Sequence, residues 1–315
     1  MRSEAPLLAV RLSAGYPAAP AVLRDVRFRI APGEILGLVG QSGSGKSTLA
    51  LAILALLRLK GGTARGEVLF RGRNLLELPE AAMRRIRGRE IGLVFQSPCS
   101  ALNPVLRIGT QLAEAWRAHG DARGRDAEEH LLATLAGVTL PADRAFLRRY
   151  PRELSVGQAQ RVLIGLAILH RPSLLIADEA TSALDAITQR EVLALVARLS
   201  RERGMAVLYI SHDLLSVASL CGRVAILHEG EVVESGPVRA IFEHPAHPYT
   251  RRLVAALPAA PAGLFRAGQI VIRSATTPLT REPAAEPDAA CADATGVSAG
   301  GAWPSPCLTA PGGTR

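Results

Sequence analysis

One short glycine-rich segment constrains this chain more than any other part of its sequence. Residues 40–47 read GQSGSGKS, which matches the pattern G-x-x-x-x-G-K-[S/T] at every fixed position. The apolar run 34–39 before the segment predicts a buried strand, and apolar residues at helical spacing over 48–57 predict a helix after it. Such a loop turns backbone N–H groups inward, and the helix N-terminus adds the positive end of its dipole. The sequence therefore predicts a site for a nucleoside triphosphate.

Two side chains of this segment have specific chemical roles in the predicted site. The Lys46 ammonium is expected to reach the β- and γ-phosphates, and the Ser47 hydroxyl is expected to ligate Mg²⁺. The candidate nucleotide-binding residues here are Gly40, Gln41, Ser42, Gly43, Ser44, Gly45, Lys46, Ser47 and Thr48.

Composition argues against several other classes of protein. The longest uncharged apolar run, 49–57, is too short to cross a bilayer, and the first residues lack the apolar core of a signal peptide. The net charge of +9 comes almost entirely from arginine, but the arginine clusters have no interleaved aromatic residues, so we expect no nucleic-acid partner. The four cysteines lie far apart and form no C-x-x-C pair, which argues against a zinc site and a disulfide framework.

Strand and helix patterns alternate through most of the chain. Residues 7–39 contain short strand patterns, and further apolar strand signals occur at 91–95, 174–177 and 207–210. Residues 106–150 are more charged and helix-like, which predicts a helical insertion. Strands alternating with helices predict an α/β fold with a parallel sheet and crossover helices.

Polar groups suited to phosphate chemistry follow two of these strands. Asp178 and Glu179 come directly after the strand at 174–177, and His212 follows the strand at 207–210. Ligands bind at the carboxyl ends of strands in open α/β sheets. We therefore expect Asp178 to hold Mg²⁺, Glu179 to activate the attacking water, and His212 to hydrogen-bond the γ-phosphate.

Further short motifs occur in a fixed order along the chain. Gln96, the segment 154–158 (LSVGQ), the Asp178–Glu179 pair and the segment 182–185 (SALD) follow the glycine-rich loop. Together they resemble the nucleotide-binding domain of the ABC ATPase superfamily over residues 7–257. The resemblance implies a P-loop NTPase with a RecA-like parallel-sheet core and an N-terminal antiparallel β subdomain. It also implies an inserted α-helical signature subdomain at about 98–168.

The resemblance assigns a role to each motif. It implies that Gln96 is the Q-loop glutamine, with a catalytic and a metal-binding role, that Glu179 is the catalytic glutamate, and that His212 is the switch histidine. Lys46 completes the catalytic set, and Ser47, Gln96 and Asp178 form the implied metal set. Tyr16 lies at a suitable distance upstream to be the aromatic residue that stacks on adenine.

A second group of residues is implied to complete the nucleotide site of a partner subunit. These residues are Ser155, Gly157, Gln158 and Asp185. The family has glycine where this chain has Val156, and a β-branched residue there adds bulk and narrows the allowed backbone. This departure favours a heterodimer in which one nucleotide site is weaker than the other.

Two stretches narrow the resemblance to one subfamily. Residues 94–104 and 247–251 are similar to those of ATPases that serve dipeptide, oligopeptide and nickel importers. The resemblance implies two transmembrane permease subunits, a second ATP-binding subunit and an extracytoplasmic substrate-binding protein. It also implies a peripheral position on the cytoplasmic face of a bacterial inner membrane. Peptide import is the first expectation, with ATP and Mg²⁺ as cofactors.

Other functions stay open at the sequence level. Nickel could be the substrate, and an accessory ATPase of a carbon–phosphorus lyase system would have similar motifs. Soluble members that act on DNA or ribosomes form a third class, but residues 97–153 show neither sustained heptads nor paired cysteines.

The last part of the chain has a different composition. Residues 258–315 are rich in Ala, Pro, Gly, Ser and Thr, and we expect this extension to be mostly disordered because it has few large apolar residues to bury. A short strand is possible around 269–272. Cys291 and Cys307 alone cannot supply the four ligands of an iron–sulfur cluster.

Overall fold

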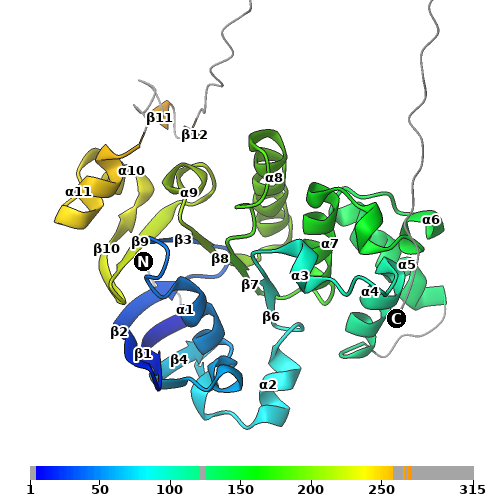
Figure 1. Cartoon of the computed structure of the whole chain (residues 1–315), viewed down its shortest axis with the longest axis horizontal. Helices are drawn as coiled ribbons and strands as arrows, with labels where there is room; N and C mark the ends of the chain where they lie inside the picture. The colour runs from blue at the N-terminus through cyan, green and yellow to red at the C-terminus, as the bar shows by residue number, and fades with distance from the viewer. Residues whose placement is uncertain (1–4, 121–124, 258–264, 267–268, 271–315) are drawn as a thin grey trace, which may run out of the picture. The chain divides into compact units, whose positions relative to one another are not determined.

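An antiparallel sheet is formed by strands from the first quarter of the chain (Figure 1). Its order is β2-β1-β4-β5, from β1 (Leu8–Tyr16), β2 (Ala19–Ile30), β4 (Thr63–Phe70) and β5 (Arg73–Asn74). In β2, Val26 and Phe28 are buried while Arg27 is exposed, because successive side chains of a strand point to opposite faces. The predicted N-terminal antiparallel β subdomain is confirmed.

The structure is a computed structural model that describes residues 5–120, 125–257, 265–266 and 269–270. Most of the extension that was predicted to be disordered therefore lies outside the described residues. Within it, β11 (Phe265–Arg266) pairs antiparallel with β12 (Gln269–Ile270), which overlaps the strand expected at 269–272. Among the described residues, no helix has the length and apolar composition needed to cross a lipid bilayer.

A six-stranded sheet lies at the centre of the described chain, with the order β10-β9-β3-β8-β7-β6. Its strands are β3 (Ile35–Val39), β6 (Ile91–Val94), β7 (Leu174–Asp178), β8 (Ala206–Ser211), β9 (Arg223–His228) and β10 (Glu231–Pro237). All neighbours are parallel except β10, which pairs antiparallel with β9. The predicted α/β fold with a parallel-sheet core is confirmed.

Both faces of this central sheet are covered, which explains why its strands are apolar throughout. Leu174 and Ile176 of β7 belong to a core shared with the antiparallel sheet and α1 (Lys46–Ile53). Leu175 and Ala177 face the opposite way, into a second core. That second core includes residues of α7 (Val156–Ile168), α8 (Ala186–Arg203) and α9 (Leu214–Leu220). Alternate residues of one strand thus pack against the two layers that cover the sheet. Burial of each Leu or Ile side chain stabilises the fold by about 1.5–3 kcal/mol.

The helix after the glycine-rich loop is shorter than predicted. We expected it over 48–57, but α1 ends at Ile53, Ala55 has φ 52°, and the chain continues as the short 3₁₀ helix η1 (Leu57–Lys60). Arg87, which lies just after α2 (Glu80–Ile86), donates hydrogen bonds to the carbonyl oxygens of Leu54 and Ala55. This contact spans more than 30 residues, so local periodicity could not reveal where the helix ends.

Residues between Gln96 and β7 form a group of helices on one side of the central sheet (Figure 1). They are α3 (Pro98–Ala101), α4 (Ile108–Arg117), α5 (Arg125–Gly137), α6 (Arg144–Leu147), η3 (Pro151–Glu153) and α7. At the end of α4, Trp116 stacks on His170 with ring centroids 4.9 Å apart and lies 4.1 Å from the ring of His130. These ring contacts connect α4 to α5 and to the segment that follows α7.

Other short helices complete the described chain. They are η2 (Leu75–Glu77), α10 (Val238–Glu243) and α11 (Pro248–Ala255). Both α10 and α11 follow β10, and Figure 1 shows them beside the β9–β10 hairpin.

Candidate active site

The parallel strands of the central sheet bring distant sequence segments to one edge. The glycine-rich loop follows β3, Gln96 lies two residues after β6, Glu179 follows β7, and His212 follows β8. These four strands run in the same direction, and the carboxyl ends of parallel strands lie at the same edge of a sheet. The fold therefore brings the predicted catalytic residues to the same edge of the sheet.

Three glycines give the loop its shape. A Cβ atom on Gly40 would lie 2.4 Å from the Leu227 carbonyl oxygen and 2.5 Å from Ser44 Oγ, so only glycine fits there. Gly43 and Gly45 have φ angles of 82° and 101°, in the region that favours glycine. Gly45 is the N-cap of α1, and no side chain caps that helix. Its first backbone N–H groups are therefore donors suited to a phosphate.

Lys46 lies directly over this loop. Its Nζ atom donates hydrogen bonds to the Gly40 oxygen at 2.8 Å and to the Gln41 oxygen at 2.9 Å. The same atom lies 3.7 Å from Glu179 Oε1, and the side chain is only 5% exposed. The ammonium thus connects the loop to the carboxylate at the end of β7.

Glu179 is the point where the predicted catalytic residues meet. Gln96 Nε2 donates a hydrogen bond to Glu179 Oε2 at 2.8 Å, and His212 Nδ1 lies 3.3 Å from the same oxygen. Glu179 has φ 49°, a left-handed conformation that costs about 1–2 kcal/mol for a residue other than glycine. Its backbone N–H donates to the Ile210 oxygen at 2.9 Å, which holds the turn beside β8. The strained turn aims the carboxylate at all three partners.

Asp178 and Ser47 provide the chemistry of a magnesium site. Asp178 is buried, and its Oδ1 atom has no hydrogen-bond partner in the described chain. Burial raises the pKa of Asp178, and the Ser47 hydroxyl beside it acts in the opposite direction. An unpartnered buried carboxylate oxygen near a hydroxyl fits Mg²⁺, which prefers oxygen ligands and keeps positions for phosphate and water.

Gln96 contacts Glu179, and its predicted metal role stays a prediction. Its amide nitrogen donates to Glu179, and the side chain is exposed. Among the described residues, no group of three or more His, Cys, Asp or Glu side chains could hold a metal ion. The predicted metal set of Ser47, Gln96 and Asp178 contains only one such side chain, so a cation here would also depend on the oxygens of a bound phosphate.

Tyr16 lies next to the first turn of α1. It ends β1, and its hydroxyl lies 3.4 Å from Thr48 Oγ1. Its ring is half-buried and also lies close to Gly62, where an added Cβ would be 3.0 Å from Tyr16 Cδ1. The predicted adenine-stacking residue is thus beside the predicted phosphate loop.

The second predicted set lies at the N-termini of two neighbouring helices. Ser155 caps α7 in a capping box with Gln158, and Asp185 caps α8 by accepting from the N–H groups of Ile187 and Thr188. An added Cβ on Gly157 would lie 2.6 Å from Thr188 Cγ2, so α7 and α8 approach closely here. Across the described chain, no hydrogen bond or ion pair joins this set to Lys46 or Glu179. We call the residues around Lys46 and Glu179 the first group and the residues at the N-termini of α7 and α8 the second group.

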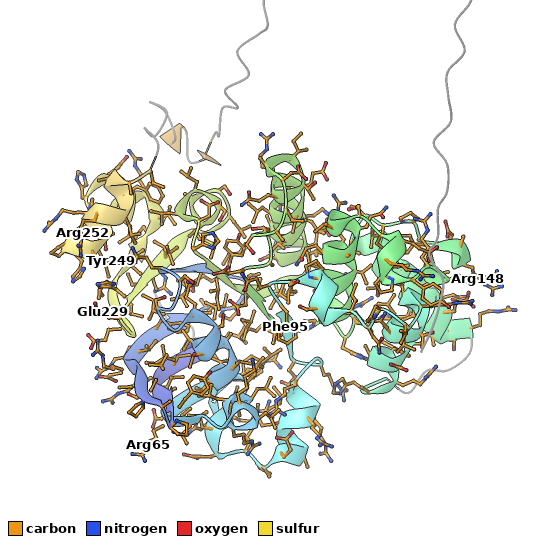
Figure 2. The ribbon with its side chains drawn as sticks, viewed as in Figure 1. Arg65, Phe95, Arg148, Glu229, Tyr249 and Arg252 are labelled. Atoms are coloured by element: carbon orange, nitrogen blue, oxygen red, sulfur yellow. The ribbon has the colours of Figure 1, made fainter. Side chains whose placement is uncertain are left out.

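Hydrophobic side chains are exposed near both groups. Val156, the first residue of α7, is 45% exposed. Phe95, directly before Gln96, is 49% exposed at the junction between β6 and the helical group (Figure 2). Val105, in the loop before α4, is 75% exposed.

A buried hydroxyl network under the site was missed by the sequence interpretation. Thr181 Oγ1 and the Tyr209 hydroxyl lie 2.8 Å apart, and the Tyr209 hydroxyl donates to Ser216 Oγ at 3.3 Å. Burial raises the pKa of Tyr209, which keeps this hydroxyl protonated. The network joins the turn after Glu179 to the start of α9, beside His212. A tyrosine within the otherwise aliphatic strand 206–210 was the one available signal.

Two family profiles match this chain. A profile described as ABC transporter matches residues 23–182, and one described as oligopeptide/dipeptide transporter, C-terminal region, matches residues 233–280. The first match covers the glycine-rich loop, Gln96 and Glu179. The second covers β10 from Val233 onward, together with α10 and α11.

Curated relatives match over most of the chain. This chain is 45% identical over 242 residues to the glutathione import ATP-binding protein GsiA of Salmonella paratyphi A. The match covers 75% of this chain and 39% of that protein. The chain thus spans less than half the length of that relative. It is 44% identical over 245 residues to the probable peptide ABC transporter ATP-binding protein y4tR of Sinorhizobium fredii, covering 78% of this chain and 73% of the relative.

A solved structure shares the architecture. The ATP-binding cassette MJ0796, a dimer in a post-hydrolysis state bound to ADP and phosphate, superposes with a TM-score of 0.63. The sequences are 28% identical, and the match covers 74% of this chain and 99% of that one.

Proposed function

The chain belongs to the ABC transporter family of ATP-binding cassettes, and we propose that it is the ATP-hydrolysing subunit of an importer for peptides. The convergence of Lys46, Gln96 and His212 on Glu179 carries the proposal of hydrolysis. The match of residues 233–280 to the oligopeptide/dipeptide transporter region supports a peptide-class substrate, which includes glutathione, over nickel.

Each residue of the first group has a role in this proposal. The loop N–H groups and Lys46 bind the phosphates, Ser47 and Asp178 hold Mg²⁺, and Tyr16 stacks on adenine. Bound Mg²⁺ supplies positive charge that offsets the charge on the transferring phosphoryl group. Glu179 orients the attacking water and accepts its proton, while Gln96 and His212 hold the carboxylate in place. Catalysis is then a matter of positioning and electrostatics.

The second group of residues supports the proposal that the chain works with a partner ATPase subunit. Ser155, Gly157, Gln158 and Asp185 lie at capped helix N-termini, where they can complete the nucleotide site of a second ATPase. The exposed Val156 at this surface favours a heterodimer, since a branched side chain keeps the backbone from a close approach to phosphate. Residues 7–257 would then be one cassette, with 98–168 as its helical subdomain and 258–315 as an extension.

The membrane partners are proposed on similar grounds. Phe95 precedes α3 in the sequence and Val105 follows it, and such exposed apolar side chains suit contact with a cytoplasmic helix of a permease. Two permeases and an extracytoplasmic binding protein would complete the importer. They would hold this subunit on the cytoplasmic face of a bacterial inner membrane.

Isolation of the tagged chain from native membranes in mild detergent, followed by mass spectrometry, tests this assignment. We expect two multi-spanning permeases and a second ATP-binding subunit, and the co-purifying binding protein would identify the substrate. Recovery of soluble enzymes or ribosomes without permeases would contradict transport while leaving the ATPase proposal intact.

A further inference from the structure

A hydrogen bond joins the glycine-rich loop to a helix 208 residues later in the chain. The Gln41 backbone N–H donates to the hydroxyl of Tyr249 in α11 at 3.3 Å. Tyr249 is buried, with 3% of its surface exposed. Its ring stacks on that of His228 at the end of β9, with centroids 3.7 Å apart and an interplanar angle of 11°. The hydroxyl is therefore held in one place by the packing of its own ring.

The start of α11 is fixed by a second set of contacts. Glu234 of β10 accepts hydrogen bonds from the N–H groups of Ala246 at 2.8 Å and His247 at 2.9 Å. His247 Nδ1 then accepts from the Tyr249 N–H at 3.2 Å and caps the helix. The chain from β10 to Tyr249 is thus pinned on both sides of Pro248.

The loop residue in this contact, Gln41, belongs to the part of the loop that accepts hydrogen bonds from Lys46. The carbonyl oxygens of Gly40 and Gln41 both accept hydrogen bonds from Lys46 Nζ. Gly40 also lies against the Leu227 oxygen, and Leu227 precedes His228 in β9. Tyr249 and the end of β9 therefore confine the Gly40–Gln41 peptide. The carbonyls of Gly40 and Gln41 in turn set where the lysine ammonium lies.

We propose that Tyr249 is a positioning residue that preorganises the Gly40–Gln41 peptide for nucleotide binding and couples α11 to that site. The inference rests on the proposed function of the loop. A loop already held in its binding conformation loses less conformational freedom when the nucleotide arrives. A displacement of α11, which lies in the matched region 233–280, moves the hydroxyl from Gln41 and weakens nucleotide binding.

The test compares the full wild-type chain with Tyr249→Phe, which keeps the stacked ring and removes only the hydroxyl. We expect the dissociation constant for MgATP to rise roughly three- to tenfold, the range for one lost hydrogen bond. In the assembled complex, KM for ATP should rise with kcat nearly unchanged. Hydrogen exchange of the Gln41 amide should become faster, which a general loss of stability would not confine to that position.

A matched control removes a hydroxyl elsewhere. Tyr150 accepts a hydrogen bond from Arg107 at 3.4 Å in the helical group, and Tyr150→Phe should leave MgATP affinity and Gln41 exchange unchanged. Wild-type affinity and Gln41 exchange in Tyr249→Phe would overturn this inference alone. Failure of the wild-type chain itself to bind MgATP would overturn the proposed function and this inference with it.

Discussion

At the scale of single residues, the site depends on one strained glutamate and on one exposed valine. Two sets of contacts hold the left-handed backbone of Glu179. Its N–H donates a hydrogen bond to the Ile210 oxygen, and its carboxylate contacts Gln96 and His212. Strain of this kind persists where the surrounding structure over-determines it, as at functional sites. Val156 differs from Glu179 because its side chain is half exposed at the first turn of α7.

The valine gives the first prediction. Val156→Gly should raise ATP hydrolysis by the assembled complex, because glycine allows the α7 N-terminus to approach the partner's phosphate more closely. Leu59→Gly is the control, since Leu59 is 78% exposed in η1, away from α7. Steady-state hydrolysis of both variants checks this; an unchanged rate in Val156→Gly would argue against an asymmetric pair.

At the scale of elements, the β9–β10 hairpin is pressed against β2. Gly230, in its turn, has φ 81°, and an added Cβ would lie 2.3 Å from the Val22 backbone oxygen. The Gly230 oxygen also accepts a hydrogen bond from the Arg24 N–H at 2.8 Å. The hairpin that contains His228 therefore depends on a close approach between two sheets.

This close approach gives a prediction of stability. Gly230→Ala should reduce the free energy of unfolding by about 2–4 kcal/mol, from the positive φ and from the backbone contact together. Gly72 has a similar φ of 78° with nothing within 4 Å of an added Cβ, so Gly72→Ala should cost only about 1–2 kcal/mol. Urea unfolding of both variants measures the difference, and equal losses would show that the turn does not press on β2.

Elements also show the limits of prediction from sequence. The phosphate loop and the strand-end carboxylates could be predicted because each motif lies within a few consecutive residues between a strand and a helix. The end of α1 could not, because Arg87 caps it from more than 30 residues away. The contact of Gln96 with Glu179 and that of Gln41 with Tyr249 depend on strand order and helix docking, which no local pattern contains.

At the scale of the whole molecule, ligand binding should be linked to folding. MgATP at a hundred times its dissociation constant should stabilise the chain by about 2.7 kcal/mol, because it binds only the folded state. Removal of Mg²⁺ with a chelator should reduce this stabilisation, since Ser47 and Asp178 are proposed to hold the cation that accompanies the phosphates. Thermal unfolding with ATP, with and without Mg²⁺, checks the prediction. An unfolding temperature that ATP does not change would contradict nucleotide binding.

The most direct test of the account is ATP turnover by the purified complex carrying Glu179→Gln. The substitution keeps the shape of the side chain and removes the charge that accepts a proton. We predict MgATP binding close to wild type and turnover reduced about 10²- to 10⁴-fold. Glu90→Gln, which changes a carboxylate paired with Arg71 and Arg73 outside the site, should keep wild-type turnover. Full hydrolysis by Glu179→Gln would contradict the central claim that the residues gathered at Glu179 form the hydrolytic site.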